Sequence, residues 1–179
     1  MKATGIVRRI DDLGRVVIPK EIRRTMRIRE GDPLEIYTDH EGEVIFKQYS
    51  PIGELAAFAT QYAETLYKAG ELSVVITDRD SVIAASGVPK KEFLDKRLTA
   101  ALEKKIEERK LYSYTDRDAA TAVTAESDGY SVRCMMPILA EGDIIGAVCS
   151  LGDKPSAPSD TELKLIRTAA TFLGKQLES

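Results

Sequence analysis

The side chains with the clearest capacity to recognise another molecule are basic and lie at the start of the chain. Residues 2–29 hold nine Lys or Arg against three acids, a local balance of +6, whereas the 179 residues together carry a net charge of −3. Guanidinium groups are planar, permanently charged and able to donate paired hydrogen bonds, which suits phosphate oxygens and guanine edges. A basic block ahead of an acidic remainder indicates a polyanionic partner, and the alternative interpretation is a solvated charged face.

Other chemically capable residues are few. The single histidine, His40, lies in a polar loop between acids, so we expect no histidine-rich metal site and no metal. The Asp11-Asp12 pair has the look of a two-carboxylate site, but aspartate satisfies turn backbone and we interpret the pair as turn-forming. Cys134 and Cys149 fall in apolar strand patterns, which favours buried structural thiols in a reducing cytoplasm. We therefore expect no catalytic residue and no cofactor.

The composition is typical of a folded globular protein. Hydrophobic residues make up 43 % of the chain, too many for a disordered protein. No apolar run approaches the roughly 18 residues of a membrane span. Because Lys2 is followed by Thr-Gly and a basic strand, we expect no signal peptide.

The first 47 residues predict short elements that would position the basic side chains. We expect a turn at residues 11–14, in which Gly14 is free to take positive φ, and a short helix with Pro19 at its first position. The expected strands are Thr4–Ile10, Arg15–Ile18, Leu34–Thr38 and Val44–Lys47. So small a segment without disulfide or metal cannot build its own core, which predicts an obligate dimer.

The remaining residues predict one α+β domain over an antiparallel sheet. Ser50-Pro51 suits the start of a helix that runs to Gly70, and Ser159-Asp160-Thr161-Glu162 is a capping box for the last helix. A middle helix is expected from Glu92 to about Arg109. The expected strands are Leu72–Thr77, Ser81–Ala85, Ala119–Glu126, Tyr130–Leu139 and Ile144–Leu151.

The first and last helices of this region carry apolar stripes wider than one sheet face needs. They predict a four-helix contact between two copies, with Leu173 at the interface, which would turn two dimers into a tetramer. A small-molecule pocket within residues 88–125 is a further candidate, and its candidate lining residues are Tyr112, Tyr114, Asp116 and Arg117.

The segment Asp12-Leu13-Gly14-Arg15-Val16-Val17-Ile18-Pro19, followed by Glu21-Ile22-Arg23-Arg24, resembles the swapped-hairpin DNA-binding domain of AbrB-type bacterial transition-state regulators. That resemblance implies two interleaved chains with one shared barrel-like core, and double-stranded DNA as the partner. The DNA-binding residues it implies, with the adjacent cations, are Arg8, Arg9, Arg15, Lys20, Arg23 and Arg24. Met26-Arg27 departs from the Leu-Gly pair common in that family, and we interpret Arg27 and Arg29 as solvated.

The C-terminal region resembles a GAF-type sensor domain, through Met136-Pro137-Ile138-Leu139, the turn at Gly142 and the Ile144–Val148 strand. The predicted domains are therefore residues 1–50, an AbrB-like head, and residues 51–179, a GAF-like tail that includes a linker helix at 51–69. Head and tail together resemble regulators of sporulation, which implies a cytoplasmic, nucleoid-associated protein of the forespore that activates and represses late genes. The resemblance leaves open whether the tail binds an unidentified small molecule.

Two alternatives remain at this stage. Heads of this type also occur in antitoxins that repress their own genes, although the apolar periodicity of residues 51–179 indicates a folded tail instead of a short disordered one. Some GAF-like domains reduce methionine sulfoxide through cysteine chemistry, which makes a thiol-dependent reductase the less favoured alternative. Slow labelling of Cys134 and Cys149 in the native protein would support the structural interpretation of both thiols.

Overall fold

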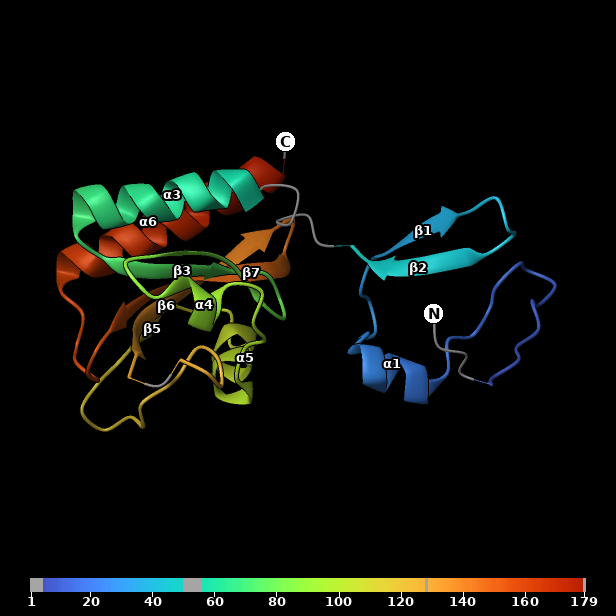
Figure 1. Ribbon diagram of the computed structural model, residues 1–179, viewed down its shortest axis with the longest axis horizontal. Coiled ribbons are helices and arrows are strands. Elements are labelled where there is room, and N and C mark those ends of the chain that lie inside the picture. The colour runs from blue at the N-terminus through green and yellow to red at the C-terminus, as the bar shows by residue number, and fades with distance from the viewer. Residues whose placement is uncertain (1–4, 50–55, 128, 179) are drawn as a thin grey trace. The chain divides into compact units, whose positions relative to one another are not determined.

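A computed structural model describes residues 5–49, 56–127 and 129–178. The chain divides into two compact units, residues 1–49 and 50–179, which we call the head and the tail (Figure 1). The predicted start of a helix at Ser50-Pro51 lies outside the described residues, as does Thr4. None of the helices in the described part of the chain has the length and apolar character that crossing a membrane requires.

The head consists of one short helix and one β-hairpin. Helix α1 spans Lys20–Met26, strand β1 spans Leu34–Thr38, and strand β2 spans Val44–Gln48, with Ile36 opposite Phe46 in the antiparallel register. Pro19 precedes α1 as its N-cap residue and not as its first helical residue. The strands expected at residues 4–10 and 15–18 are not formed by the described residues of these segments.

A head of one chain encloses almost no core. Pro19 is the only buried residue among residues 5–49, and large apolar side chains there lie open to solvent. Val7 is 87 % exposed, Ile10 72 %, and Val17 71 %. Apolar burial is the main driving force for folding, so these side chains require cover that their own chain does not supply.

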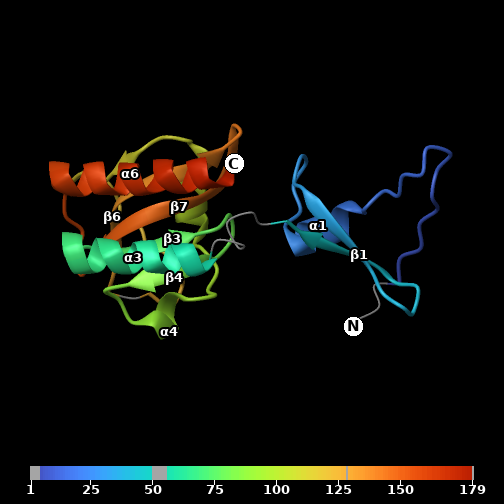
Figure 2. The same ribbon diagram turned by 90° about the horizontal axis from the view of Figure 1, so that it is seen from above.

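The tail is built on a five-stranded antiparallel sheet in the order β4-β3-β7-β6-β5. Helices α3 (Ala56–Gly70) and α6 (Asp160–Leu177) lie side by side on one face, and the short helices α4 (Lys90–Phe93) and α5 (Ala100–Glu107) lie on the other (Figures 1 and 2). The strands are β3 (Ser73–Thr77), β4 (Val82–Ser86), β5 (Tyr112–Ser113), β6 (Ser131–Ala140) and β7 (Asp143–Gly152).

Alternation along the central strands gives the tail two apolar layers. Val74 and Ile76 face α3 and α6, whereas Val75 between them faces α4 and α5, because successive side chains of a strand point to opposite faces. Cys134 belongs to the first layer and Cys149 to the second. Both thiols are therefore part of the core, as the sequence predicts.

The capping box predicted at Ser159 is present at the start of α6. The Ser159 hydroxyl accepts a hydrogen bond from the Glu162 amide at 3.1 Å, and the Glu162 carboxylate accepts one from the Ser159 amide at 3.4 Å. Ile166 and Leu173 on this helix are completely buried in their own chain. The expectation that Leu173 faces a second copy is therefore wrong, because the sheet already covers it.

Two predicted elements of the tail differ from the structure. The single helix expected over residues 92–109 is interrupted, because Asp95 takes the left-handed conformation at φ 59° and Thr99 starts α5 as a new N-cap. The strand expected at 119–126 is a loop that makes one isolated bridge, between Leu98 and Thr124. Its residues Thr121, Val123 and Thr124 are buried, so the apolar pattern there reflects packing against α5 and not a strand.

Candidate nucleic-acid interface

The tight turn at residues 11–15 is organised by the side chain of Asp11. Its Oδ1 accepts hydrogen bonds from the backbone N–H groups of Leu13 at 3.0 Å and Arg15 at 2.8 Å. The Asp11 and Arg15 backbones are also joined, with Asp11 N donating to Arg15 O at 3.0 Å. Gly14 adopts φ +74°, the left-handed conformation that glycine takes without steric cost. The turn and the turn-forming role of Asp11 are as predicted.

The second oxygen of Asp11 holds the side chain of Arg15. Arg15 Nε lies 2.9 Å from Asp11 Oδ2, although the arginine side chain remains 69 % exposed. Hydrogen bonding lowers the pKa of Asp11, chiefly through the backbone N–H of Arg15, against a smaller opposing effect of burial. The sequence interpretation missed this ion pair, for which the i, i+4 spacing of an acid and an arginine was the available signal.

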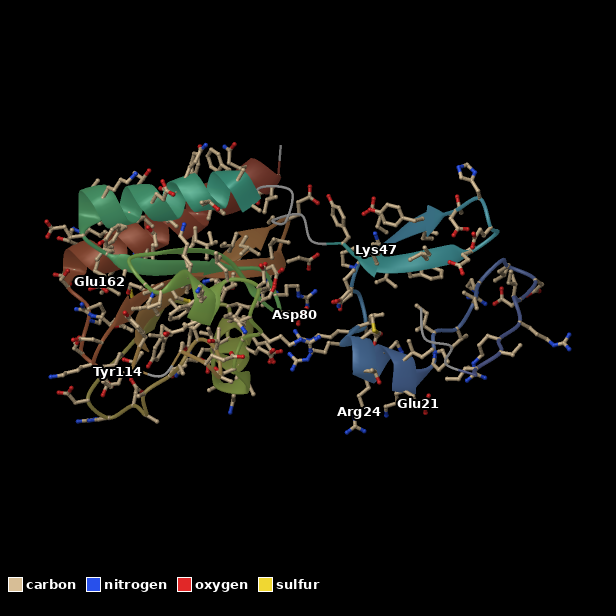
Figure 3. The ribbon with its side chains drawn as sticks, in the orientation of Figure 1. Glu21, Arg24, Lys47, Asp80, Tyr114 and Glu162 are labelled. Atoms are coloured by element: carbon tan, nitrogen blue, oxygen red, sulfur yellow. The ribbon has the colours of Figure 1, made fainter. Side chains whose placement is uncertain are left out.

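Helix α1 gathers three of the candidate cations within two turns. Lys20 begins the helix, and Arg23 and Arg24 lie in its last turn, where positive charge is favoured by the helix dipole. Arg24 projects from α1 on the side away from β1 and β2 (Figure 3). In contrast, the Nε atom of Arg23 is buried and has no hydrogen-bond partner in the described part of the chain.

The end of α1 takes its shape from Arg27, which is in the left-handed conformation at φ 55°. The N–H of Ile28 donates to Arg23 O at 2.8 Å and that of Arg27 to Arg24 O at 3.3 Å, the bonds of a Schellman motif. Glycine is the usual residue at this position, and this is where the sequence departs from the AbrB pattern.

Arg8 and Arg9 precede the turn on the exposed segment that leads into it. Neither they nor Lys20, Arg23 and Arg24 form an ion pair with any described residue, so their charge is available to an external anion. The structure thus places the six candidate cations on two adjoining pieces of the head, the turn with its flanks and α1. It does not place Arg8 and Arg9 on a strand within one chain.

The thiols of the tail are poorly suited to nucleophilic chemistry. Burial is the main reason why the pKa of Cys134 is raised to about 11. Burial also raises the pKa of Cys149, to a value above that of Cys134. Cys134 Sγ lies 3.1 Å from Ser150 Oγ, its hydrogen-bonding partner in the core. A reactive cysteine requires a lowered pKa and access to solvent, and these two have neither.

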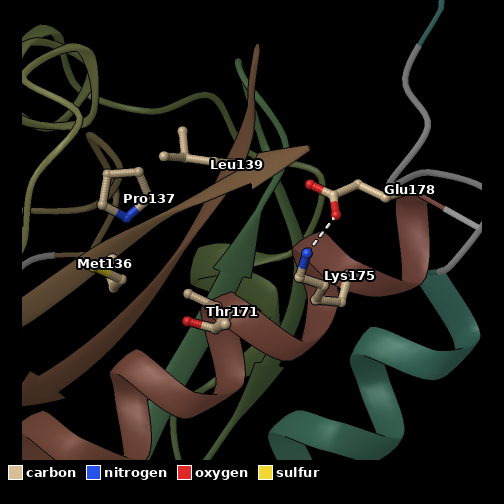
Figure 4. A pocket seen from close by; sticks show the side chains of 7 residues that line it. Met136, Pro137, Leu139, Thr171, Lys175 and Glu178 are labelled. Atoms are coloured by element: carbon tan, nitrogen blue, oxygen red, sulfur yellow. Dashed lines mark hydrogen bonds and ion pairs between the residues drawn. The ribbon is translucent and has the colours of Figure 1, made fainter. Parts of the chain in front are cut away.

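The residues proposed to line a pocket within 88–125 differ in exposure, and the hypothesis of a pocket there stays a prediction. Tyr114 is buried, Asp116 and Arg117 are exposed, and Tyr112 packs on the α5 side with Lys105 Nζ 3.8 Å from its ring centroid. A pocket of about 210 Å³ lies between β6 and the end of α6 (Figure 4). Its lining includes Met136, Leu139, Thr171, Lys175 and Glu178.

Comparison with known proteins gives matches to both units. Residues 54–178 match the family described as "Stage V sporulation protein T C-terminal, transcription factor", and residues 7–52 match "Antidote-toxin recognition MazE, bacterial antitoxin". Stage V sporulation protein T of Bacillus subtilis (strain 168) is 51 % identical over 178 residues, 99 % of each chain. Transition state regulatory protein AbrB of the same organism is 63 % identical over 51 residues, which is 28 % of this chain and 52 % of that protein.

The fold of the tail also has a solved counterpart. The GAF domain of a phosphoenolpyruvate-protein phosphotransferase from Coxiella burnetii superposes with a TM-score of 0.57 at 15 % identity, over 69 % of this chain and 82 % of the other. Identity that low carries the fold alone, and that fold is the predicted GAF-like one. Because the family match covers more than half of the chain and a relative is 51 % identical along nearly its whole length, the chain belongs to the stage V sporulation protein T family of transcription factors.

Proposed function

We propose that the head binds double-stranded DNA through Arg8, Arg9, Arg15, Lys20, Arg23 and Arg24. The observation that carries this proposal is the concentration of cations without acidic partners on the turn and α1, next to an ion pair that orders Arg15. Phosphate neutralisation by such side chains supplies affinity, and paired N–H groups of arginine supply contacts to base edges.

The DNA-binding unit in this proposal is a dimer of heads. Support comes from the large apolar side chains on either side of the turn, which lie open to solvent among the described residues of one chain. Interleaving two heads would supply both the missing strands and the missing core. A dimer would also present each arginine twice.

The salt dependence of DNA binding tests the proposal. If Arg8, Arg15, Arg23 and Arg24 of both chains displace counterions, log K falls against log[salt] with a slope near −7, and fewer contacts give a shallower slope, at about −0.9 per phosphate. Arg15→Ala should weaken binding to every duplex. Arg167→Ala on α6 removes the same charge from the tail and should leave binding unchanged. An Arg15→Ala protein that is folded and binds as tightly as the wild type would contradict the proposal.

In the cell we assign the chain to gene control late in sporulation, in agreement with the name of its B. subtilis relative. The working model is a nucleoid-associated regulator in the forespore cytoplasm that activates some genes and represses others. Transcript profiles of a deletion strain at successive stages of sporulation test it, because changes confined to vegetative cells would contradict it. An antitoxin role is less favoured, because the folded tail continues the chain far beyond residues 7–52.

For the tail we propose assembly and not catalysis. Buried thiols of raised pKa argue against a reductase. The aromatic side chains of Phe58, Tyr62 and Phe172 form a stacked group across α3 and α6, with Phe172 38 % exposed, and this group supports pairing of two dimers into a tetramer. Two linked pairs of heads would gain avidity on targets that both can reach.

A further inference from the structure

The two carboxylate oxygens of Asp11 serve different groups. Oδ1 accepts the backbone N–H groups of Leu13 and Arg15 and so fixes the turn, whereas Oδ2 accepts Nε of the Arg15 side chain at 2.9 Å. The turn therefore needs only one oxygen. Among the described residues, the second oxygen accepts no hydrogen bond from the backbone of the turn and bonds to the guanidinium group of Arg15.

An acid in this place is unexpected on electrostatic grounds. Asp11 lies two or three positions from Arg8 and Arg9 on the surface that, by the proposed function, faces a polyanion, where a negative charge repels phosphate. The neighbouring acid, Asp12, makes no such contact. Its side chain forms no hydrogen bond or ion pair within the described part of the chain. The special feature of Asp11 is thus its hold on Arg15.

We propose that Asp11 is a positioning residue for DNA recognition, which holds Arg15 by Nε so that the Nη1 and Nη2 groups are presented together to the DNA. Restricting one guanidinium before binding reduces the conformational entropy that binding must remove. The Nη1–Nη2 edge matches a pair of acceptors, either two phosphate oxygens or O6 and N7 of guanine. This inference rests on the proposed function, since it requires Arg15 to contact DNA.

Asp11→Asn is the decisive variant, because the amide keeps Oδ1 as the acceptor for the turn and replaces Oδ2 with an NH2 group that cannot accept from Nε. Asp12→Asn is its control, with the same loss of charge one residue away. Binding of the full-length chain is measured on two probes, a mixed-sequence duplex and the tightest duplex obtained by in vitro selection with the wild type. Each substitution is also made in the Arg15→Ala background.

We expect Asp11→Asn to weaken binding about fivefold, the effect of freeing one side chain that had been ordered. The control Asp12→Asn should bind at least as tightly as the wild type, because it only removes a repulsive charge. An equal loss on both probes would identify phosphate as the acceptor, and a loss confined to the selected duplex would identify guanine. In the Arg15→Ala background the loss from Asp11→Asn should vanish.

Two results would overturn the inference. The first is an Asp11→Asn protein that binds as tightly as Asp12→Asn. The second is a loss that persists in the Arg15→Ala background, because it would come from a damaged turn. Failure of the proposed function is a separate result, since it would appear in the wild type as absent or salt-independent DNA binding.

Discussion

Arg133 on β6 and Glu162 in the first turn of α6 form an ion pair within the tail, with Nη2 3.1 Å from Oε2. The Glu162 side chain is only 3 % exposed, and its carboxylate also completes the capping box with Ser159. Arg133 lies where the register of β6 against β7 shifts between Val132 and Cys134, a bulge that turns its side chain toward the helix. One carboxylate thus both caps α6 and ties it to the sheet.

Glu162→Gln should therefore destabilise the tail. The amide keeps the shape and an acceptor for the cap but leaves Arg133 without its counter-charge, which costs about 2–4 kcal/mol for a pair as buried as this one. Urea unfolding followed by tail-specific hydrogen exchange measures the change. Lys175→Met is the comparison, because it breaks the exposed pair with Glu178, which solvent screens, and it should change stability far less than Glu162→Gln does. Equal effects of the two substitutions would contradict this account.

The tail thiols should resist modification until the protein unfolds. With a pKa of about 11 in place of 9.0, Cys134 has roughly a hundredfold less thiolate at pH 8 than an ordinary cysteine, before shielding is counted. Labelling of the native chain should be slower than that of the urea-unfolded chain by at least this factor. Fast native labelling of either thiol would restore the reductase alternative.

The raised pKa of Cys134 also makes the stability of the tail depend on pH in the alkaline range. The folded state holds the Cys134 proton more tightly than the unfolded state, so this contribution to stability is fully present below pH 9. Between pH 9 and about 11 the unfolded thiol ionises while the folded one does not, and stability falls as pH rises. Cys134→Ala should make this decline shallower than in the wild type. An identical alkaline decline in both proteins would exclude Cys134 as its source.

Local patterns predicted well those elements whose partners lie in the same chain. The sequence predicts the capping box at Ser159 because its residues are only three positions apart. It predicts the β6–β7 hairpin because the two strands and their turn are consecutive in the chain. The helix expected at 92–109 failed because its apolar spacing continues through Leu94 and Leu98, although the backbone breaks at Asp95. The wide apolar stripe on α6 predicts a contact with a second copy at Leu173, whereas the core of its own chain buries Leu173 completely. The spacing of apolar residues predicts which face of a helix is apolar, but it does not predict which part of the protein covers that face.

For the candidate basic site, the sequence predicts which residue types are present more readily than how their side chains are arranged. Charge balance located the basic block of residues 2–29, and the resemblance to the AbrB-type head implied which of its cations are candidates for contacting DNA. The hold of Asp11 Oδ2 on Arg15 depends on a side-chain conformation that spacing alone does not specify. The described residues beside the turn do not form the expected strands, because a strand also needs a neighbour to pair with and local patterns do not reveal one.

Folding of the head should depend on protein concentration. A fragment of residues 1–50 has Pro19 as its only buried residue among positions 5–49, so a single copy lacks the core that stability requires. If two copies complete one core, the melting temperature of the fragment rises with its concentration. Val17→Asp, on the exposed segment after the turn, should abolish folding at every concentration. Sedimentation that finds a folded monomer at micromolar concentration would exclude the interleaved dimer.

Assembly through the tail makes opposite predictions for two neighbouring residues of α6. Phe172 is 38 % exposed and stacks on Phe58 and Tyr62, with ring centroids 5.7 and 5.6 Å apart, whereas Leu173 is fully buried in its own chain. Phe172→Asp should leave the tail folded and convert tetramers to dimers, because a charge would enter the contact between copies. Arg167→Asp, an exposed position on a different face of the same helix, should leave tetramers intact.

Leu173→Asp, by contrast, places a charge in the core and should unfold the tail instead of dissociating it. Mass measured by light scattering, together with thermal unfolding of each variant, separates the two effects. A Phe172→Asp protein that remains tetrameric would exclude the aromatic group as the contact. In that case another surface of the tail would join the two dimers, and the aromatic group across α3 and α6 would lie outside the contact between copies.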